Sequence, residues 1–241
     1  MSQAMWVIIP AAGVGQRMLS DCPKQYLSLA GETILDRTIE VFLTHPCIAG
    51  VVVGLGADDA YWSDSKWCDN PEIRTYVGGA ERCDTVQKGL QLLQKMSVEI
   101  DRQVLVHDAA RPLLSHTALS RIIKHESAQG ALLAMPSKDT VKQQGDVSSV
   151  ESSPKVKSTL DRRHIWLAQT PQKFPLGALL DALVQADMDG KQVTDECSAM
   201  ELQGWQPDLV MGENSNIKVT LPEDLIIAEA LFSHLSNSKA H

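Results

Sequence analysis

The sequence lacks the long apolar runs and the excess of positive charge that mark two large classes of protein. No run of apolar residues approaches the ~18 residues needed to cross a membrane. The formal net charge is −8, which disfavours a surface that coats DNA or RNA. We therefore expect neither a membrane nor a nucleic acid as a partner, and an anionic ligand would need a local cluster of cations.

Paired cysteines and zinc-binding histidines are missing as well. The five cysteines form no C-x-x-C pair, and the seven histidines include no H-E-x-x-H. A zinc site is therefore not expected, and scattered free thiols are typical of a reducing compartment, so we expect a cytoplasmic protein. The apolar run at residues 7–10 is short, includes Pro10 and follows no basic residue, which favours a buried strand over a signal peptide.

Short apolar runs alternate with amphipathic stretches along the 241 residues. The runs lack strict alternation, as is typical of strands that are buried on both faces. The alternation predicts one α/β domain over residues 1–241, with three layers and a mostly parallel twisted sheet whose ligands lie at the carboxyl ends of the strands. The predicted strands are residues 7–10, 51–55, 75–77, 103–107 and 131–135, and the clearest helices cover residues 34–43 and 86–96.

Residues 137–162 interrupt this pattern, because they are polar and show no helical period. Residues 140–142 and 156–160 are predicted to pair as a protruding hairpin, with a disordered loop as the alternative. The last helix is expected to begin at a capping box formed by Thr220 and Glu223. Its expected core face consists of Leu225, Ile226, Ala228 and Leu231.

The stretch PAAGVGQRM, residues 10–18, directly follows the first predicted strand. Met18 occupies the third glycine place of a G-x-G-x-x-G pattern, and no G-x-x-x-x-G-K-[ST] is present, so the two common nucleotide loops are excluded. Small residues still allow backbone N–H groups to approach an anion closely. These small residues are Ala11, Ala12, Gly13 and Gly15.

Arg17 and Lys24 add two cations within eight residues of this loop. A fixed guanidinium and an ammonium beside a glycine-bearing loop suit a polyphosphate whose charge shifts during a reaction. The alternative is an ordinary turn between strand and helix, with both charges in solvent.

PAAGVGQRM with PKQYL (23–27) resembles the nucleotide loop of sugar-phosphate nucleotidyltransferases, and VHDAARP (106–112) resembles a hallmark of the cytidylyltransferases that act on methylerythritol phosphate. TLDR (159–162), AQTPQ (168–172), TDE (194–196) and NIKVT (216–220) follow in that family's order, so the resemblance covers nearly the whole chain. It implies a Rossmann-like nucleotidyltransferase fold. It also implies transfer of a cytidylyl group from CTP to methylerythritol phosphate, with release of pyrophosphate, in isoprenoid synthesis.

The resemblance also implies roles for individual residues. Arg17 and Lys24 would flank the triphosphate and stabilise the transition state. Residues 78–82, GGAER, resemble a second nucleotide loop, although Ala80 and Thr85 replace the acidic residue and the serine that are common there; a plain turn is the alternative. The implied nucleotide-binding residues are Ala11, Ala12, Gly13, Gly15, Gly79, Thr85 and Asp108.

Asp108 follows a predicted strand at the edge of the sheet where ligands gather. A carboxylate beside a triphosphate can share Mg²⁺ with phosphate oxygens, so Asp108 is the predicted metal ligand, with a helix or turn cap as the alternative. Neighbouring His107 is expected to be structural, and Asp195 is expected either to belong to the site or to cap the helix after it. The resemblance implies that the sugar-alcohol phosphate is held by Asp108, Arg111, Thr140, Arg162, Thr170 and Lys218.

Two other functions remain open at this point. A cytidylyltransferase for ribitol 5-phosphate would share the loops and the arginines, and a catalytically inactive nucleotide-binding module would share part of them. The related enzymes form homodimers through an arm like residues 137–162, so we expect a homodimer in which each active site is shared.

Overall fold

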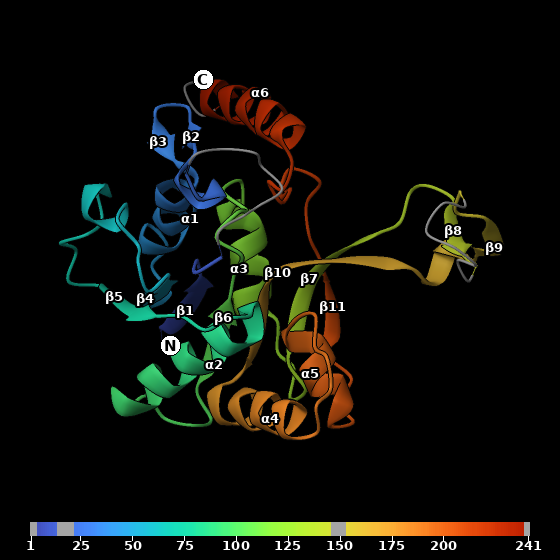
Figure 1. Ribbon diagram of the computed structural model, residues 1–241, viewed down its shortest axis with the longest axis horizontal. Helices are drawn as coiled ribbons and strands as arrows, with labels where there is room; N and C mark the ends of the chain where they lie inside the picture. Colours follow the sequence, from blue (N-terminus) through green and yellow to red (C-terminus); the bar gives the residue numbers. More distant parts are fainter. Residues whose placement is uncertain (1–3, 14–21, 146–152, 239–241) are drawn as a thin grey trace.

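A seven-stranded sheet forms the centre of the protein in its computed structural model (Figure 1). The structure describes residues 4–13, 22–145 and 153–238. Its strands are β1 (Met5–Pro10), β4 (Ile48–Leu55), β5 (Ile73–Val77), β6 (Gln103–Val106), β7 (Ala131–Pro136), β10 (Trp166–Pro175) and β11 (Asp208–Met211). They lie in the order β11-β7-β10-β6-β1-β4-β5.

Neighbouring strands of this sheet run parallel except at β10, which is antiparallel to both β6 and β7. The predicted mostly parallel α/β sheet is confirmed, and each of the five predicted strands is present. β10 and β11 are absent from the predictions. β10 was not predicted because it contains Thr170, Gln172 and Lys173, polar residues that the folded chain buries.

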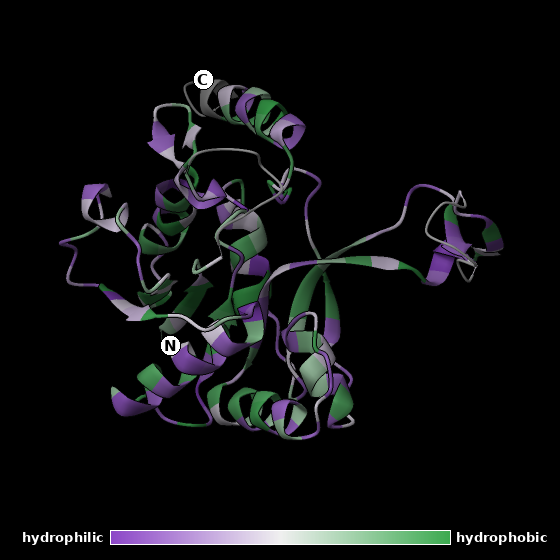
Figure 2. Ribbon diagram, in the orientation of Figure 1, coloured by the Kyte–Doolittle hydropathy of each residue, from purple (hydrophilic) through white to green (hydrophobic). Residues whose placement is uncertain are grey.

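Successive residues of the central strands pack against different layers of helices. Val7 and Ile9 belong to one hydrophobic cluster, and Ile8 between them belongs to another. Side chains alternate between the two faces of a strand, so a strand that is apolar at every position is covered on both faces. Figure 2 shows the resulting hydrophobic colour of the central strands.

Helices cover both faces of the sheet, as the three-layer prediction requires. The helices are α1 (Ile34–Leu43), α2 (Arg82–Lys95), α3 (His116–Lys124), α4 (Leu176–Met188), α5 (Glu196–Leu202) and α6 (Pro222–Ser238). α1 and α3 contribute to the cluster on one face, and α2, α4 and α5 contribute to the cluster on the other. Among the described residues, no helix has both the length and the apolar character that a membrane span needs.

α6 packs over a small two-stranded sheet, β2 (Ser28–Leu29) and β3 (Glu32–Thr33), through a third cluster that includes Leu29 and Ala228. The prediction that Ile226 belongs to its core face is wrong, because that side chain is 70% exposed. Ile226 lies about 100° around the helix from Leu225, and the contact face of this peripheral helix is too narrow to include both.

The start of α6 also differs from the predicted capping box. Asp224, rather than Glu223, accepts hydrogen bonds from the Thr220 hydroxyl at 2.7 Å and from the Thr220 and Leu221 N–H groups at 2.8 Å. Because α6 begins at Pro222, Asp224 is the third residue of the helix and accepts from the Leu221 N–H just before it, so the helix start and its carboxylate both lie one residue later than predicted.

The predicted hairpin is present as β8 (Val141–Gln144) and β9 (Val156–Leu160), an antiparallel pair with Val141 opposite Leu160. This arm stands well away from the sheet and its helices (Figure 1). Short 3₁₀ turns complete the described chain: η2 (Lys24–Tyr26), η3 (Trp62–Asp64) and η4 (Arg162–His164).

Candidate active site

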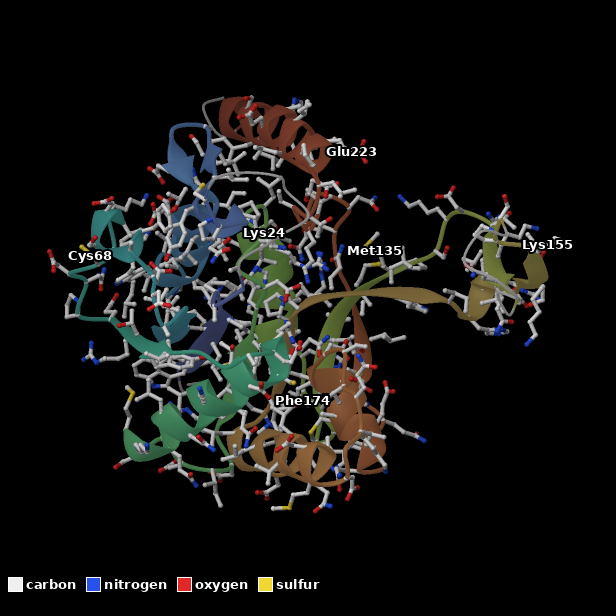
Figure 3. All side chains as sticks on the ribbon, viewed as in Figure 1. Lys24, Cys68, Met135, Lys155, Phe174 and Glu223 are labelled. Atoms are coloured by element: carbon white, nitrogen blue, oxygen red, sulfur yellow. The ribbon has the colours of Figure 1, made fainter. Side chains whose placement is uncertain are left out.

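A cavity of about 180 Å³ opens at the carboxyl ends of β1 and β6, the edge of the sheet where ligands are expected. Its walls come from the segments that follow β1, β5 and β6, together with η2 and the segment before α6. Figure 3 shows Lys24 in this central region and Lys155 far from it on the arm. The predicted site residues that line the cavity are Ala11, Ala12, Gly13, Lys24, Gly79, Thr85, Asp108 and Lys218.

The first loop leaves the sheet at Pro10 but remains tied to its neighbours. The Ala11 N–H donates to the Gly54 carbonyl at 2.8 Å, and the Ala11 carbonyl accepts from the buried Gln25 side-chain amide at 2.7 Å. Gln25 therefore fixes this loop relative to Lys24, its neighbour in η2. Sequence reasoning missed Gln25, because its partner becomes visible only when the fold brings the two segments together.

The second loop requires its glycines because it passes very close to other groups. A Cβ on Gly78 would lie 2.5 Å from the Cβ of Ala12 in the first loop, and a Cβ on Gly79 would lie 2.2 Å from the Cβ of Asp84. The two loops are thus in contact at the cavity wall. Close approach, rather than an ordinary turn, is the reason for the Gly-Gly pair.

Thr85 fastens this second loop to the first turn of α2. Its hydroxyl accepts from the Gly79 N–H at 3.0 Å and donates to the Glu81 carbonyl at 3.1 Å. The residue is almost fully buried. The threonine that replaces the family's common serine therefore shapes the loop through its hydroxyl.

Three cations surround the Asp108 carboxylate. Arg82 Nε donates to its Oδ1 at 2.9 Å, while Lys218 Nζ lies 2.9 Å and Arg111 Nε lies 3.4 Å from its Oδ2. Burial acts to raise the pKa of Asp108, but the three cations outweigh it and hold that pKa well below the usual range. The site thus gathers positive charge around one fixed carboxylate, although the whole chain is acidic.

A buried network supports Asp108 from behind. The Thr170 hydroxyl accepts from the Asp108 N–H at 3.1 Å and lies 3.0 Å from His107 Nδ1, and His107 Nε2 lies 3.1 Å from the Arg111 carbonyl. Because that carbonyl only accepts, His107 carries its proton on Nε2 and accepts from Thr170. Burial lowers the pKa of His107 to about 4, so the ring is neutral, as its expected structural role requires.

Arg111 and Thr170 therefore lie behind Asp108 rather than in the cavity wall. Arg111 Nη1 donates to the Asn216 carbonyl at 2.7 Å, and the Thr170 hydroxyl is engaged by its two buried neighbours. Their roles toward the sugar-alcohol phosphate remain predictions.

Arg82 and Glu196 join the site to a distant helix, and the sequence analysis gave neither residue a role of its own, although both lie in motifs that carry the resemblance. Arg82, the first residue of α2, places Nη1 2.7 Å from Glu196 Oε1 and Nη2 3.1 Å from Glu196 Oε2. Burial acts to lower the pKa of Arg82, but Glu196 and Asp108 outweigh it and raise that pKa. Asp195, whose role was left open, caps α5 by accepting from the Ser198 N–H.

The remaining predicted residues lie elsewhere. Thr140 and Arg162 are exposed at the arm, where Arg162 donates to the Lys138 carbonyl, and neither lines the cavity of its own chain. Gly15 and Arg17 lie outside the described residues. Within the described ranges, no three His, Cys, Asp or Glu side chains are grouped so that they would hold a metal ion.

Comparison with known proteins identifies the family. The model of the family 2-C-methyl-D-erythritol 4-phosphate cytidylyltransferase (IspD) matches residues 5–234. The chain belongs to this family. A cytidylyltransferase of that name from Pseudomonas aeruginosa (strain UCBPP-PA14) is 46% identical over 233 residues, which are 96% of this chain and 97% of that protein. One from Pseudomonas putida (strain GB-1) is 46% identical over 92% of this chain and 93% of its own.

Solved structures of the cytidylyltransferase family share the fold. A crystal structure of 4-diphosphocytidyl-2C-methyl-D-erythritol synthase is 32% identical, with a TM-score of 0.81, and covers 96% of this chain and 100% of its own. The 2-C-methyl-D-erythritol 4-phosphate cytidylyltransferase of Francisella tularensis is 35% identical, with a TM-score of 0.78, and covers 94% of this chain and 98% of its own. The resemblance first seen in the ordered motifs is confirmed.

Proposed function

We propose that this enzyme transfers the cytidylyl group of CTP to 2-C-methyl-D-erythritol 4-phosphate, giving 4-diphosphocytidyl-2-C-methyl-D-erythritol and pyrophosphate in isoprenoid synthesis. The observation that carries this proposal is the cavity at the carboxyl ends of the strands. Two loops of small residues form its walls, and Lys24, Lys218 and Asp108 line it. The ribitol 5-phosphate alternative is not favoured, because the family model and the relatives are named for the methylerythritol substrate.

The reaction is an in-line displacement at phosphorus. A phosphate oxygen of methylerythritol phosphate attacks the α-phosphorus of CTP, the bond from that phosphorus to the bridging oxygen breaks, and pyrophosphate leaves with the electron pair. A phosphate is already a nucleophile at neutral pH, so no strong general base is required. Both nitrogens of His107 are engaged in the buried network, which suits a reaction without a histidine base.

Catalysis then depends on positioning two anions and on stabilising the charge that moves toward pyrophosphate. Backbone groups of residues 11–13 and of Gly79 are proposed to hold the nucleotide, with Thr85 supporting the second loop. Lys24, with Arg17, is proposed to offset the charge that develops on the α-phosphate and the leaving group. Lys218, which contacts Asp108 Oδ2, is proposed to orient the attacking phosphate.

The reaction is proposed to use Mg²⁺ bound to the phosphates of CTP, with Asp108 as its carboxylate ligand. A carboxylate that lines the cavity and stays ionised fits this hard cation, which is commonly held by one or two carboxylates together with substrate phosphates. When bound, the ion would supply positive charge to the phosphate oxygens. Asp108 already contacts three cations, so room for the ion requires Lys218 to turn toward the substrates.

The chain is further proposed to form one nucleotidyltransferase domain that assembles as a homodimer through residues 137–162. The arm carries Thr140 and Arg162 away from the cavity of its own chain, which suits delivery of both residues to the phosphate site of a partner. Free thiols at all five cysteines suit a cytoplasmic enzyme, and the acidic chain suits small-molecule substrates rather than a nucleic acid.

Pyrophosphate release from a panel of nucleotides and polyol phosphates tests this function. Release is expected with CTP and methylerythritol phosphate and is expected to be far slower with ATP, GTP or ribitol 5-phosphate. A pocket of fixed backbone groups rejects a base that leaves those groups unpaired. Comparable kcat/KM for GTP would refute the proposed base specificity, and faster turnover of ribitol 5-phosphate would refute the proposed acceptor.

A further inference from the structure

Arg82 stands where three parts of the active site meet. It follows the second nucleotide loop as the first residue of α2, lines the cavity, and donates from Nε to Asp108 Oδ1 at 2.9 Å. Its two terminal nitrogens form a paired contact with the Glu196 carboxylate. Glu196 therefore determines which way the guanidinium faces, because a planar fork held at two nitrogens cannot rotate freely.

Glu196 is buried and fixed in place, as the task of orienting Arg82 requires. Only 1% of the residue is exposed. The side chain of Gln172 holds the start of α5 against the sheet through its two polar groups. The Gln172 side chain donates to Asp195 Oδ2 at 2.8 Å and accepts from the Cys197 N–H at 2.8 Å. Gln172 lies on β10 opposite Val106, the last residue of β6, so Glu196 is fixed to the same strands that carry Asp108.

We infer that Glu196 is a positioning residue for cytidylyl transfer. It holds Arg82 on Asp108 Oδ1, so that Asp108 Oδ2 faces Lys218 and the guanidinium stays off the nucleotide. The inference rests on the proposed function, since it assigns Glu196 a part in that reaction without contact to either substrate. Arg82 and Glu196 are 114 positions apart in the sequence, and their pairing exists only in the folded site.

If Glu196 positions Arg82, neutralising Glu196 has a consequence for CTP binding that would not follow if Glu196 only stabilised the fold. Glutamine keeps the shape but presents one NH₂ group to a guanidinium that only donates, so the paired contact fails. Arg82 then keeps Asp108 as its one charged partner beside an anionic triphosphate, and its two terminal nitrogens are released to turn toward that triphosphate. CTP binding in the ground state is kept or strengthened, whereas Asp108 and Lys218 lose their fixed arrangement and the chemical step slows.

The test compares wild type, Glu196→Gln and the matched control Glu201→Gln, which makes the same change on the same helix away from Arg82. Calorimetry measures CTP binding without the second substrate, and steady-state pyrophosphate release gives kcat and both KM values. For Glu196→Gln we expect kcat to fall about tenfold to a hundredfold, as misplacement by about 1 Å can produce. Its CTP dissociation constant should equal or fall below that of wild type, and Glu201→Gln should match wild type in both.

A kcat for Glu196→Gln within about twofold of the control would overturn the inference. So would a fall in kcat accompanied by an equal weakening of CTP binding, because that pattern indicates a collapsed site. If Glu196→Gln does not fold, Glu196→Asp applies the same criteria, since it keeps the charge but is too short to hold both nitrogens. Wild type that releases no pyrophosphate from CTP and methylerythritol phosphate would refute the proposed function itself.

Discussion

Replacing Thr85 with valine isolates the hydroxyl that holds the second nucleotide loop. Valine has nearly the shape of threonine, so the change removes the bond from the Gly79 N–H and the bond to the Glu81 carbonyl with little change in packing. The Glu81 carbonyl keeps a second donor, the Thr85 N–H at 3.1 Å. The main loss is therefore at Gly79, whose N–H has to find water at the cavity wall.

The size of the effect follows from these two bonds. A hydrogen bond contributes about 1 kcal/mol net, and a buried donor left unpaired costs about 1–3 kcal/mol. Because Gly79 borders an open cavity, we expect the lower part of this range, a loss of about 1–2 kcal/mol in the free energy of unfolding. For a chain of this size that loss lowers Tm by about 2–8 °C. If the loop around Gly79 loses order by this amount of free energy and has to be ordered again when CTP binds, CTP affinity falls about 5- to 30-fold.

Thr85→Ser is the matched control, because it keeps the hydroxyl and loses only a methyl group. Thermal unfolding gives the stability of both variants, and calorimetry gives their CTP affinities. We expect Thr85→Ser to bind CTP like wild type, and Thr85→Val to bind more weakly with kcat at saturating CTP little changed. Equal CTP affinities for the two variants would refute the assigned role of the hydroxyl.

Three further predictions concern catalysis, assembly and pH. Lys24→Ala should lower kcat on the order of 10²-fold in a pyrophosphate-release assay with little change in the KM for methylerythritol phosphate, and a near-normal kcat would contradict its transition-state role. Lys24→Ala and Arg162→Ala should each be nearly inactive, yet mixing them with verified subunit exchange should restore a fraction of wild-type activity, because one site of a mixed dimer carries neither change; no recovery would rule out shared sites. His107 has its pKa lowered from 6.5 to about 4 in the folded chain, so the unfolded chain binds a proton that the folded chain does not between these values. The contribution of His107 to the free energy of unfolding should therefore be unchanged above pH 6.5 and fall by about 3 kcal/mol as the pH drops to 4, so urea unfolding of His107→Asn should show a correspondingly smaller fall than wild type.

Local chemistry was enough to predict the sheet and the loop of small residues after β1, whereas the loop at residues 78–82 was predicted from the family resemblance. Val7, Ile8 and Ile9 form a continuous apolar run that is typical of a strand covered on both faces, and the structure buries all three. The structure adds the physical reason for Gly78 and Gly79, which is their close approach to Ala12 and Asp84. Asp108 is readable because it follows a buried strand at the edge where ligands gather.

Only the tertiary structure determined which residues hold the site residues in place. Gln25 pairs with Ala11 14 positions away, and Arg82 pairs with Glu196 114 positions away, so no local period or spacing reveals these contacts. β10 was hidden for the same reason: the polar side chains of Gln172 and Lys173 look exposed until α5 and the end of α3 provide their partners. Burial of a polar group depends on a hydrogen-bond partner, and that partner is set by the fold rather than by neighbouring residues.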